Sequence, residues 1–217
     1  MARVFLFDFD GTLVDSMPTF TGMMSRILDE NSISWDTEIL RTVTPLGYRG
    51  AAEYFRELGI DLPVDVMIER MYELALEEYR TRIPLKEGVA ETLRALASKG
   101  ADLNILTASP HAALDVVLER HGITPLFHEV WSSEDFGTTK SDPAIYEMAA
   151  ERLGCTVGEV VFVDDNLTAV RTAKAAGMRA VGIFDESSAE RADEIRAAAD
   201  RYVMEFSELL AEQEVTA

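Results

Sequence analysis

The chain has 217 residues, enough for one or two domains, and 47% of them are hydrophobic, which is typical of a globular protein with a sizeable core. Its 39 acidic and 20 basic residues give a formal net charge of −19. A field of this sign repels nucleic acid and anionic membranes, so neither is expected as a partner. Any site for a phosphorylated substrate must therefore supply positive charge locally, from a divalent cation or from cationic side chains.

The N-terminal segment has only a short apolar run before Asp8, too short for the apolar region of a signal peptide. No apolar stretch elsewhere approaches the length that a membrane span needs. These two features predict a cytoplasmic protein.

Short apolar runs alternate along the chain with stretches of helical periodicity. This alternation predicts an α/β fold with a parallel sheet covered by helices. We expect strands at residues 4–7, 103–106, 129–131, 160–163 and 180–184, an edge strand at 201–204, and helices at 89–98, 112–120 and 143–153. The acidic segment after Glu205 is predicted to form a solvated last helix.

One interval breaks this rhythm, because about ninety residues separate the first strand from the second, far more than a crossover helix requires. Amphipathic helical patterns fill it at residues 20–29, 38–43, 50–58 and 64–79. The interval predicts a small helical cap domain at residues 17–83, inserted into a core formed by residues 1–16 and 84–217. Its hinges are expected near residues 15–18 and 82–87.

Carboxylates follow two of the predicted strands. Asp8 and Asp10 end the first strand, and Asp164 and Asp165 end the strand at 160–163. If these strands are neighbours, three or four acidic groups meet at the carboxyl edge of the sheet, where open α/β sheets bind ligands. Such a cluster is strongly self-repulsive unless a cation compensates it, and a hard cation such as Mg²⁺ prefers oxygen ligands. The sequence therefore predicts a Mg²⁺ site.

Two further segments fit a phosphate site at the same edge. Thr107, Ala108 and Ser109 follow the strand at 103–106 and offer hydroxyl and backbone N–H groups to phosphate oxygens. Lys140 precedes the helix at 143–153, where the helix dipole does not explain a cation. Beside the carboxylates, Lys140 is the expected counter-charge.

Taken in order, the four segments resemble the haloacid dehalogenase-like hydrolase superfamily over nearly the whole chain. The first motif looks like Asp8-Phe9-Asp10-Gly11-Thr12, and the later motifs match Thr107, Lys140 and the pair Asp164-Asp165. The resemblance implies a doubly wound, Rossmann-like parallel sheet with a helical cap inserted after the first strand.

The resemblance also implies a mechanism. Asp8 would attack the phosphorus to form an aspartyl-phosphate, and Asp10 would serve as the acid and base. Thr107, the N–H of Ala108 and Lys140 would bind the phosphoryl oxygens. Mg²⁺ would be held by Asp8, the backbone carbonyl of Asp10, Asp164 and Asp165.

Within the superfamily, Asp10 favours phosphoester chemistry, because true dehalogenases lack an acid at this position. Beta-phosphoglucomutases carry a His where this chain has Phe20, which favours a phosphatase over a mutase. Thr168 stands where a common form of the fourth motif has a second acid, which puts direct contact between Asp165 and the metal in doubt.

The sequence thus predicts a Mg²⁺-dependent phosphatase of a small phosphorylated metabolite, acting through an aspartyl-phosphate on Asp8. Phosphoglycolate and small sugar phosphates are the first candidates by family analogy. The alternatives are a phosphotransferase or mutase acting on a sugar phosphate, and a non-catalytic Mg²⁺-binding domain resembling a receiver domain.

Substrate specificity is expected in the cap, where two glycines flank an aromatic and a cation at residues 45–50. Arg49 is the candidate for binding a second anionic group of the substrate. The protein is expected to be a monomer or a homodimer.

Overall fold

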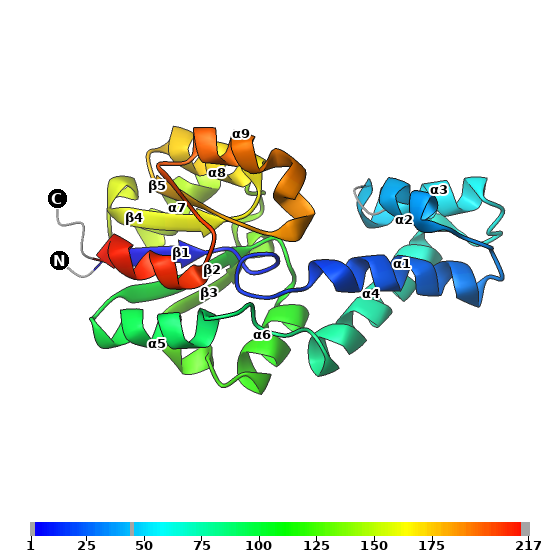
Figure 1. Cartoon of the computed structure of the whole chain (residues 1–217), viewed down its shortest axis with the longest axis horizontal. Coiled ribbons are helices and arrows are strands. Elements are labelled where there is room, and N and C mark those ends of the chain that lie inside the picture. The colour runs from blue at the N-terminus through cyan, green and yellow to red at the C-terminus, as the bar shows by residue number, and fades with distance from the viewer. Residues whose placement is uncertain (1–2, 44–45, 214–217) are drawn as a thin grey trace. The chain divides into compact units, whose positions relative to one another are not determined.

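The computed structural model describes residues 3–43 and 46–213 (Figure 1). Pro45, the first residue of the predicted specificity segment, lies outside the described residues. The chain forms two compact units, one made of Met1–Asp15 and Pro84–Ala217 and the other of Ser16–Ile83. Within the described ranges, no helix is both long and apolar enough to cross a membrane.

The first unit is built on a six-stranded sheet in which every strand pair is parallel. The strand order is β3-β2-β1-β4-β5-β6, so the chain builds outward from β1 on one side and then crosses over to build outward on the other. The strands are β1 Val4–Phe7, β2 Asp102–Thr107, β3 Glu129–Ser132, β4 Val160–Asp164, β5 Arg179–Ile183 and β6 Arg201–Val203. The predicted fold class is confirmed.

Helices cover both faces of this sheet (Figure 1). Alternate residues of β1 point to opposite faces, and Val4 and Leu6 lie in one apolar cluster with side chains of α7 and α8. On the other face the ring of Phe7 packs against that of Phe206, with centroids 5.7 Å apart. The helices of this unit are α5 Val89–Ser98, α6 His111–Arg120, α7 Ala144–Arg152, α8 Leu167–Ala176 and α9 Ala192–Ala198, with 3-10 segments η2 Thr124–Leu126, η3 Ser133–Phe136, η4 Val157–Glu159, η5 Glu186–Arg191 and η6 Phe206–Gln213.

The second unit is helical. Its helices are α1 Met17–Glu30, α2 Thr37–Val43, α3 Gly47–Glu57 and α4 Val64–Thr81. Each helix buries apolar side chains along one face. Examples are Ile27 of α1, Phe55 of α3 and Met71 of α4. Phe20 of α1, Tyr48 and Tyr72 form a run of aromatic contacts, with ring centroids 5.9 Å and 4.6 Å apart.

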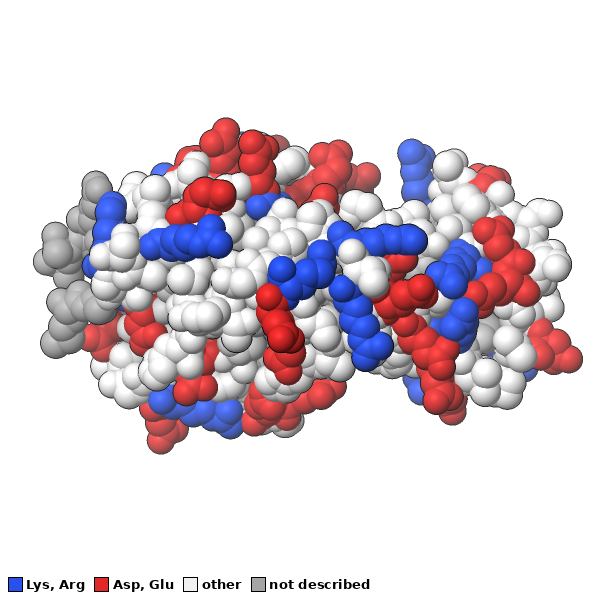
Figure 2. Space-filling view, turned by 90° about the horizontal axis from the view of Figure 1, so that it is seen from below, with Lys and Arg blue, Asp and Glu red and all other residues white. Residues whose placement is uncertain are grey.

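Charged side chains of both signs are visible on the face of the molecule drawn in Figure 2. On the face drawn in Figure 2, acidic and basic side chains lie next to one another, with uncharged areas between them. The net charge of −19 is therefore not gathered into a single acidic patch on this face.

The acidic C-terminal segment differs from its prediction as a solvated helix. It forms the 3-10 segment η6, in which Phe206, Leu209 and Glu212 are buried. Glu212 accepts hydrogen bonds from the guanidinium groups of Arg179 (2.6 Å) and Arg201 (3.2 Å), which begin β5 and β6. The ion pairs of Arg179 and Arg201 with Glu212 therefore hold η6 against the sheet, although its acidic composition suggested exposure.

These two arginines hold the pKa of Glu212 below its ordinary value of 4.5, although burial alone would raise it. A lowered folded-state pKa contributes stability that is fully present above pH 4.5 and is lost as pH falls through the folded-state value. We expect Glu212→Gln to lower the free energy of unfolding by about 1.5–3 kcal/mol at pH 7. Urea denaturation should show this difference shrinking between about pH 4.5 and pH 3. An unchanged difference over that range would contradict the assignment.

Candidate active site

The site is built where β1 and β4 end side by side. The parallel register pairs Phe7 with Val163, and the N–H of Asp8 donates to the carbonyl of Val163 at 2.9 Å. Asp8 and Asp164 therefore leave adjacent strands at the same edge. This edge lies at the point where the strand order reverses, which is the usual ligand-binding position in doubly wound sheets.

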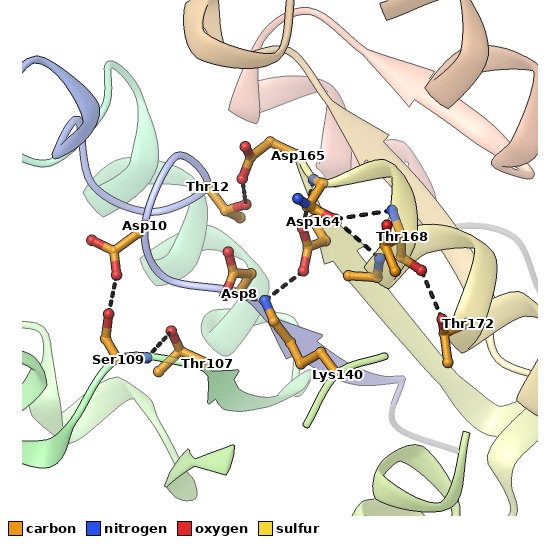
Figure 3. Close-up of polar contacts among 12 residues, drawn as sticks. Asp8, Asp10, Thr12, Thr107, Ser109, Lys140, Asp164, Asp165, Thr168 and Thr172 are labelled. Carbon is orange, nitrogen blue, oxygen red and sulfur yellow. Dashed lines mark hydrogen bonds and ion pairs between the residues drawn. The ribbon is translucent and has the colours of Figure 1, made fainter. Parts of the chain in front are cut away.

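Three buried carboxylates converge there. Asp8, Asp164 and Asp165 are 5%, 0% and 8% exposed, and each offers an oxygen within 4.8 Å of the others (Figure 3). Asp10 lies outside this group, because its side chain points instead toward Ser109. The predicted convergence of three or four carboxylates thus occurs with three side chains.

Lys140 lies between two of these carboxylates. Its Nζ donates to Asp164 Oδ2 at 2.8 Å and to Asp8 Oδ1 (Figure 3). The side chain is only 13% exposed, so little water screens these ion pairs. Lys140 occupies the position expected of the counter-charge.

The electrostatic balance of the cluster appears in its pKa values. Burial would lower the pKa of Lys140, but Asp164 and Asp8 outweigh burial and raise it. Burial and the charge of Asp8 raise the pKa of Asp164 to about 7, against the opposing effect of Lys140. Burial and the neighbouring charges of Asp164, Asp8 and Asp185 raise the pKa of Asp165 well above its ordinary value. One lysine does not neutralise this cluster.

Two residues that the sequence analysis did not single out fix the cluster's geometry. The hydroxyl of Tyr146, on α7, donates to the backbone carbonyl of Lys140 at 2.9 Å. Asp164 Oδ1 accepts from the N–H of Asn166 at 2.7 Å, and the Asn166 side chain caps α8 through the N–H groups of Thr168 and Ala169. The Asp-Asp-Asn sequence before a helix was the available signal for Asn166, whereas nothing in the sequence singled out Tyr146.

The turn after β1 packs closely against the side chain of Asp165. Gly11 has a φ of +78°, and a Cβ there would lie 2.7 Å from both carboxylate oxygens of Asp165. Thr12, which is fully buried, donates its hydroxyl to Asp165 Oδ1 at 3.1 Å. Only glycine fits at position 11, because both the backbone conformation and the close carboxylate exclude a side chain.

The segment after β2 lies next to Asp10. Thr107 is buried, and its Oγ1 accepts from the N–H of Ser109 at 3.1 Å, which leaves the hydroxyl proton of Thr107 available to donate. Ala108 is exposed. The hydroxyl of Ser109 donates to Asp10 Oδ2, a contact that the sequence analysis did not anticipate (Figure 3).

Arg49 lies in the other unit, on α3. Its Nη2 pairs with Asp65 Oδ1 at 3.2 Å, and the two side chains are 66% and 86% exposed. An ion pair this exposed contributes little to stability. The guanidinium can therefore exchange this partner for another anion at low cost.

Comparison with known proteins identifies the family. The family model described as haloacid dehalogenase-like hydrolase matches residues 2–177. The chain belongs to the haloacid dehalogenase-like hydrolase family. The resemblance inferred from the motifs is therefore confirmed, as is the prediction that the chain is a hydrolase.

Three individual proteins that are similar to this chain each share less than 30% identity with it. A phosphoglycolate phosphatase from Pseudomonas putida is 29% identical over 191 residues, which cover 84% of this chain and 70% of the relative. Among solved structures, one described as a candidate beta-phosphoglucomutase from Thermotoga maritima has a TM-score of 0.84 at 23% identity, and the match covers 99% of this chain and 100% of that chain. One described as a predicted phosphoglycolate phosphatase from Haemophilus somnus has a TM-score of 0.82 at 21% identity, with 97% of each chain covered. These two structures show the shared fold.

Proposed function

We propose that this hydrolase is a Mg²⁺-dependent phosphatase that removes the phosphoryl group of a small phosphorylated metabolite through an aspartyl-phosphate on Asp8. The observation that carries the proposal is the contact of Lys140 with both Asp8 and Asp164. The Lys140 ammonium therefore lies beside the proposed nucleophile, where it supplies the positive charge that an incoming phosphate needs.

In the proposed reaction, a carboxylate oxygen of Asp8 attacks the phosphorus while the bond from phosphorus to the leaving oxygen breaks. Asp10 gives its proton to that oxygen. A water molecule then attacks the phosphorus of the aspartyl-phosphate, Asp10 takes a proton from it, and the bond from Asp8 to phosphorus breaks. The products are the dephosphorylated metabolite and inorganic phosphate.

The donor set fits Mg²⁺. Asp8, Asp164 and Asp165 offer hard carboxylate oxygens within 4.8 Å of one another, and the family pattern adds the backbone carbonyl of Asp10. When bound, the ion would supply positive charge between the nucleophile and the phosphate. Asp165 is held by Thr12, so it is oriented whether it contacts the ion directly or through water.

Phosphoryl oxygens are the proposed ligands of Thr107, the Ala108 N–H and Lys140. The free hydroxyl proton of Thr107 supports this role, because its Oγ1 already accepts from Ser109. Lys140 supports it by charge, since donors aimed at developing negative charge in a buried site contribute strongly to catalysis.

Two observations favour this reaction over its alternatives. Phe20, which stands where mutases carry a His, packs against the Tyr48 ring and has no group to transfer a proton. Membership in a hydrolase family argues against a non-catalytic receiver-like domain.

Phosphoglycolate is the first candidate substrate, because the Pseudomonas putida relative is named for it. Location in the cytoplasm, the role of residues 17–83 as a cap and the state as monomer or homodimer stay predictions.

Hydrolysis of p-nitrophenyl phosphate with Mg²⁺ tests the reaction. We expect EDTA to abolish phosphate release and excess Mg²⁺ to restore it. Asp8→Asn should lower kcat by at least about 10³-fold, because the amide is not a nucleophile.

Asp193→Asn is the matched control, since this aspartate is fully exposed on α9 and should leave kcat unchanged. A pure, folded wild-type protein that released no phosphate from p-nitrophenyl phosphate or phosphoglycolate would contradict the proposed function. So would full activity of Asp8→Asn.

For Arg49 we propose a contact with a second anionic group of the substrate. Arg49→Ala should then raise KM for phosphoglycolate about tenfold, the usual effect of losing a hydrogen bond between charged groups. KM for p-nitrophenyl phosphate, which lacks a second anion, should stay unchanged. Arg56→Ala, on the same helix and also exposed, is the control. An unchanged KM for phosphoglycolate and other carboxylate phosphates would remove Arg49 from the site.

A further inference from the structure

We infer that Lys86 is a positioning residue for the proposed acid and base Asp10, because its side chain holds the turn that directly follows Asp10. This inference rests on the proposed phosphatase function and extends it to a residue outside the four motifs.

The ammonium of Lys86 has all three of its donors occupied. Nζ donates to the carbonyl of Gly11 at 2.7 Å, to the carbonyl of Phe184 at 2.6 Å and to Asp185 Oδ2 at 3.0 Å. The side chain is only 19% exposed. With its donors taken and its charge matched by Asp185, Lys86 is suited to fix backbone and not to bind substrate.

The backbone around Lys86 holds the same turn. Its N–H donates to the carbonyl of Leu13 at 3.0 Å, and the N–H of Asp15 donates to the carbonyl of Pro84 at 3.0 Å. Val14 and Leu85 form an antiparallel bridge between these two bonds. Residues 84–86 thus pair with residues 13–15 through backbone contacts, and the Lys86 side chain adds a contact with Gly11.

Asp165 restrains the turn from its other side. Its carboxylate leaves no room for a Cβ at Gly11 and accepts the hydroxyl of Thr12 at 3.1 Å. The turn is therefore held between Asp165 and Lys86, and Asp10 is the residue that immediately precedes it. Loss of the Lys86 side chain removes the partner of the Gly11 carbonyl and weakens one side of this support, so we expect the Asp10 carboxylate to be positioned less firmly, with the Ser109 bond remaining.

Asp185 makes Lys86 important for stability as well. Asp185 is 4% exposed, and it also accepts from the N–H and hydroxyl of Ser187. Removing Lys86 alone leaves this carboxylate without its cation, which destabilises the fold for reasons unrelated to catalysis. A test of positioning must therefore measure something that stability does not change.

The dependence of rate on the leaving group is such a measurement. A misplaced general acid slows expulsion of a poor leaving group, an alkoxide, more than expulsion of a good one, a nitrophenolate. We expect Lys86→Met to lower kcat/KM for alkyl phosphates by about 30-fold or more and for p-nitrophenyl phosphate by less than about 3-fold, within the range of general acid catalysis. A plot of log kcat/KM against the pKa of the leaving alcohol should become steeper.

Three further variants make the result interpretable. Lys174→Met removes another ion-paired lysine of the same unit, which contacts Asp200 at 3.1 Å, and should leave the slope unchanged. Asp185→Asn removes the ion pair but keeps the bond from Lys86 to Gly11, so its slope should also match the wild type. The double variant Lys86→Met with Asp185→Asn leaves no unpaired charge, so it should fold if the single variant does not, and its slope should match that of Lys86→Met.

Equal loss for every leaving group, or no loss, in a folded variant without Lys86 would overturn the positioning role while leaving the proposed function intact. A steeper slope in Asp185→Asn would assign the effect to the ion pair and also overturn it. A wild-type protein that hydrolyses none of the phosphate esters would refute the proposed function, and the inference with it.

Discussion

The pairing of Lys140 with Asp8 and Asp164 is the interaction on which the site depends. Two like charges about 4 Å apart repel by about 4 kcal/mol at an effective dielectric constant of ~20, so three buried carboxylates are stable only if compensated. When all three are ionised, one ammonium leaves a formal charge of −2 on Asp8, Asp164 and Asp165. A hard divalent cation has the charge and the ligand preference to offset this remainder.

The topology of the sheet explains why this cluster forms where it does. The chain builds the sheet outward from β1 to β3, crosses over to β4 and continues to β6, so β1 and β4 are central neighbours. Both end in carboxylates at the same edge. Lys140 comes from the segment before α7, and Tyr146 on that helix holds the Lys140 backbone in place. Packing of the buried face of α7, which includes Ile145 and Ala149, therefore sets the position of the cation.

Much of this arrangement could be predicted because it depends on sequence patterns within short segments of the chain. Apolar runs marked the strands, and the Asp-x-Asp-Gly-Thr motif marked the residues proposed as nucleophile and acid. Contacts between distant segments carry no such signal, so Lys86 and the Ser109 bond to Asp10 emerged only from the structure. The segment around Glu212 was predicted to be exposed because its composition is acidic, yet the strands bring Arg179 and Arg201 together beneath it.

Transfer of the phosphoryl group to Asp8 is the central claim, and chemical trapping tests it most directly. The protein would be mixed with a substrate carrying a radioactive phosphoryl group, quenched in acid within one turnover and digested for peptide mapping. The label should appear on the peptide that contains Asp8 before inorganic phosphate is released, and it should be absent from Asp8→Asn. Label on another residue would contradict the mechanism. So would the absence of any labelled protein from an active enzyme under conditions in which breakdown of the aspartyl-phosphate limits turnover.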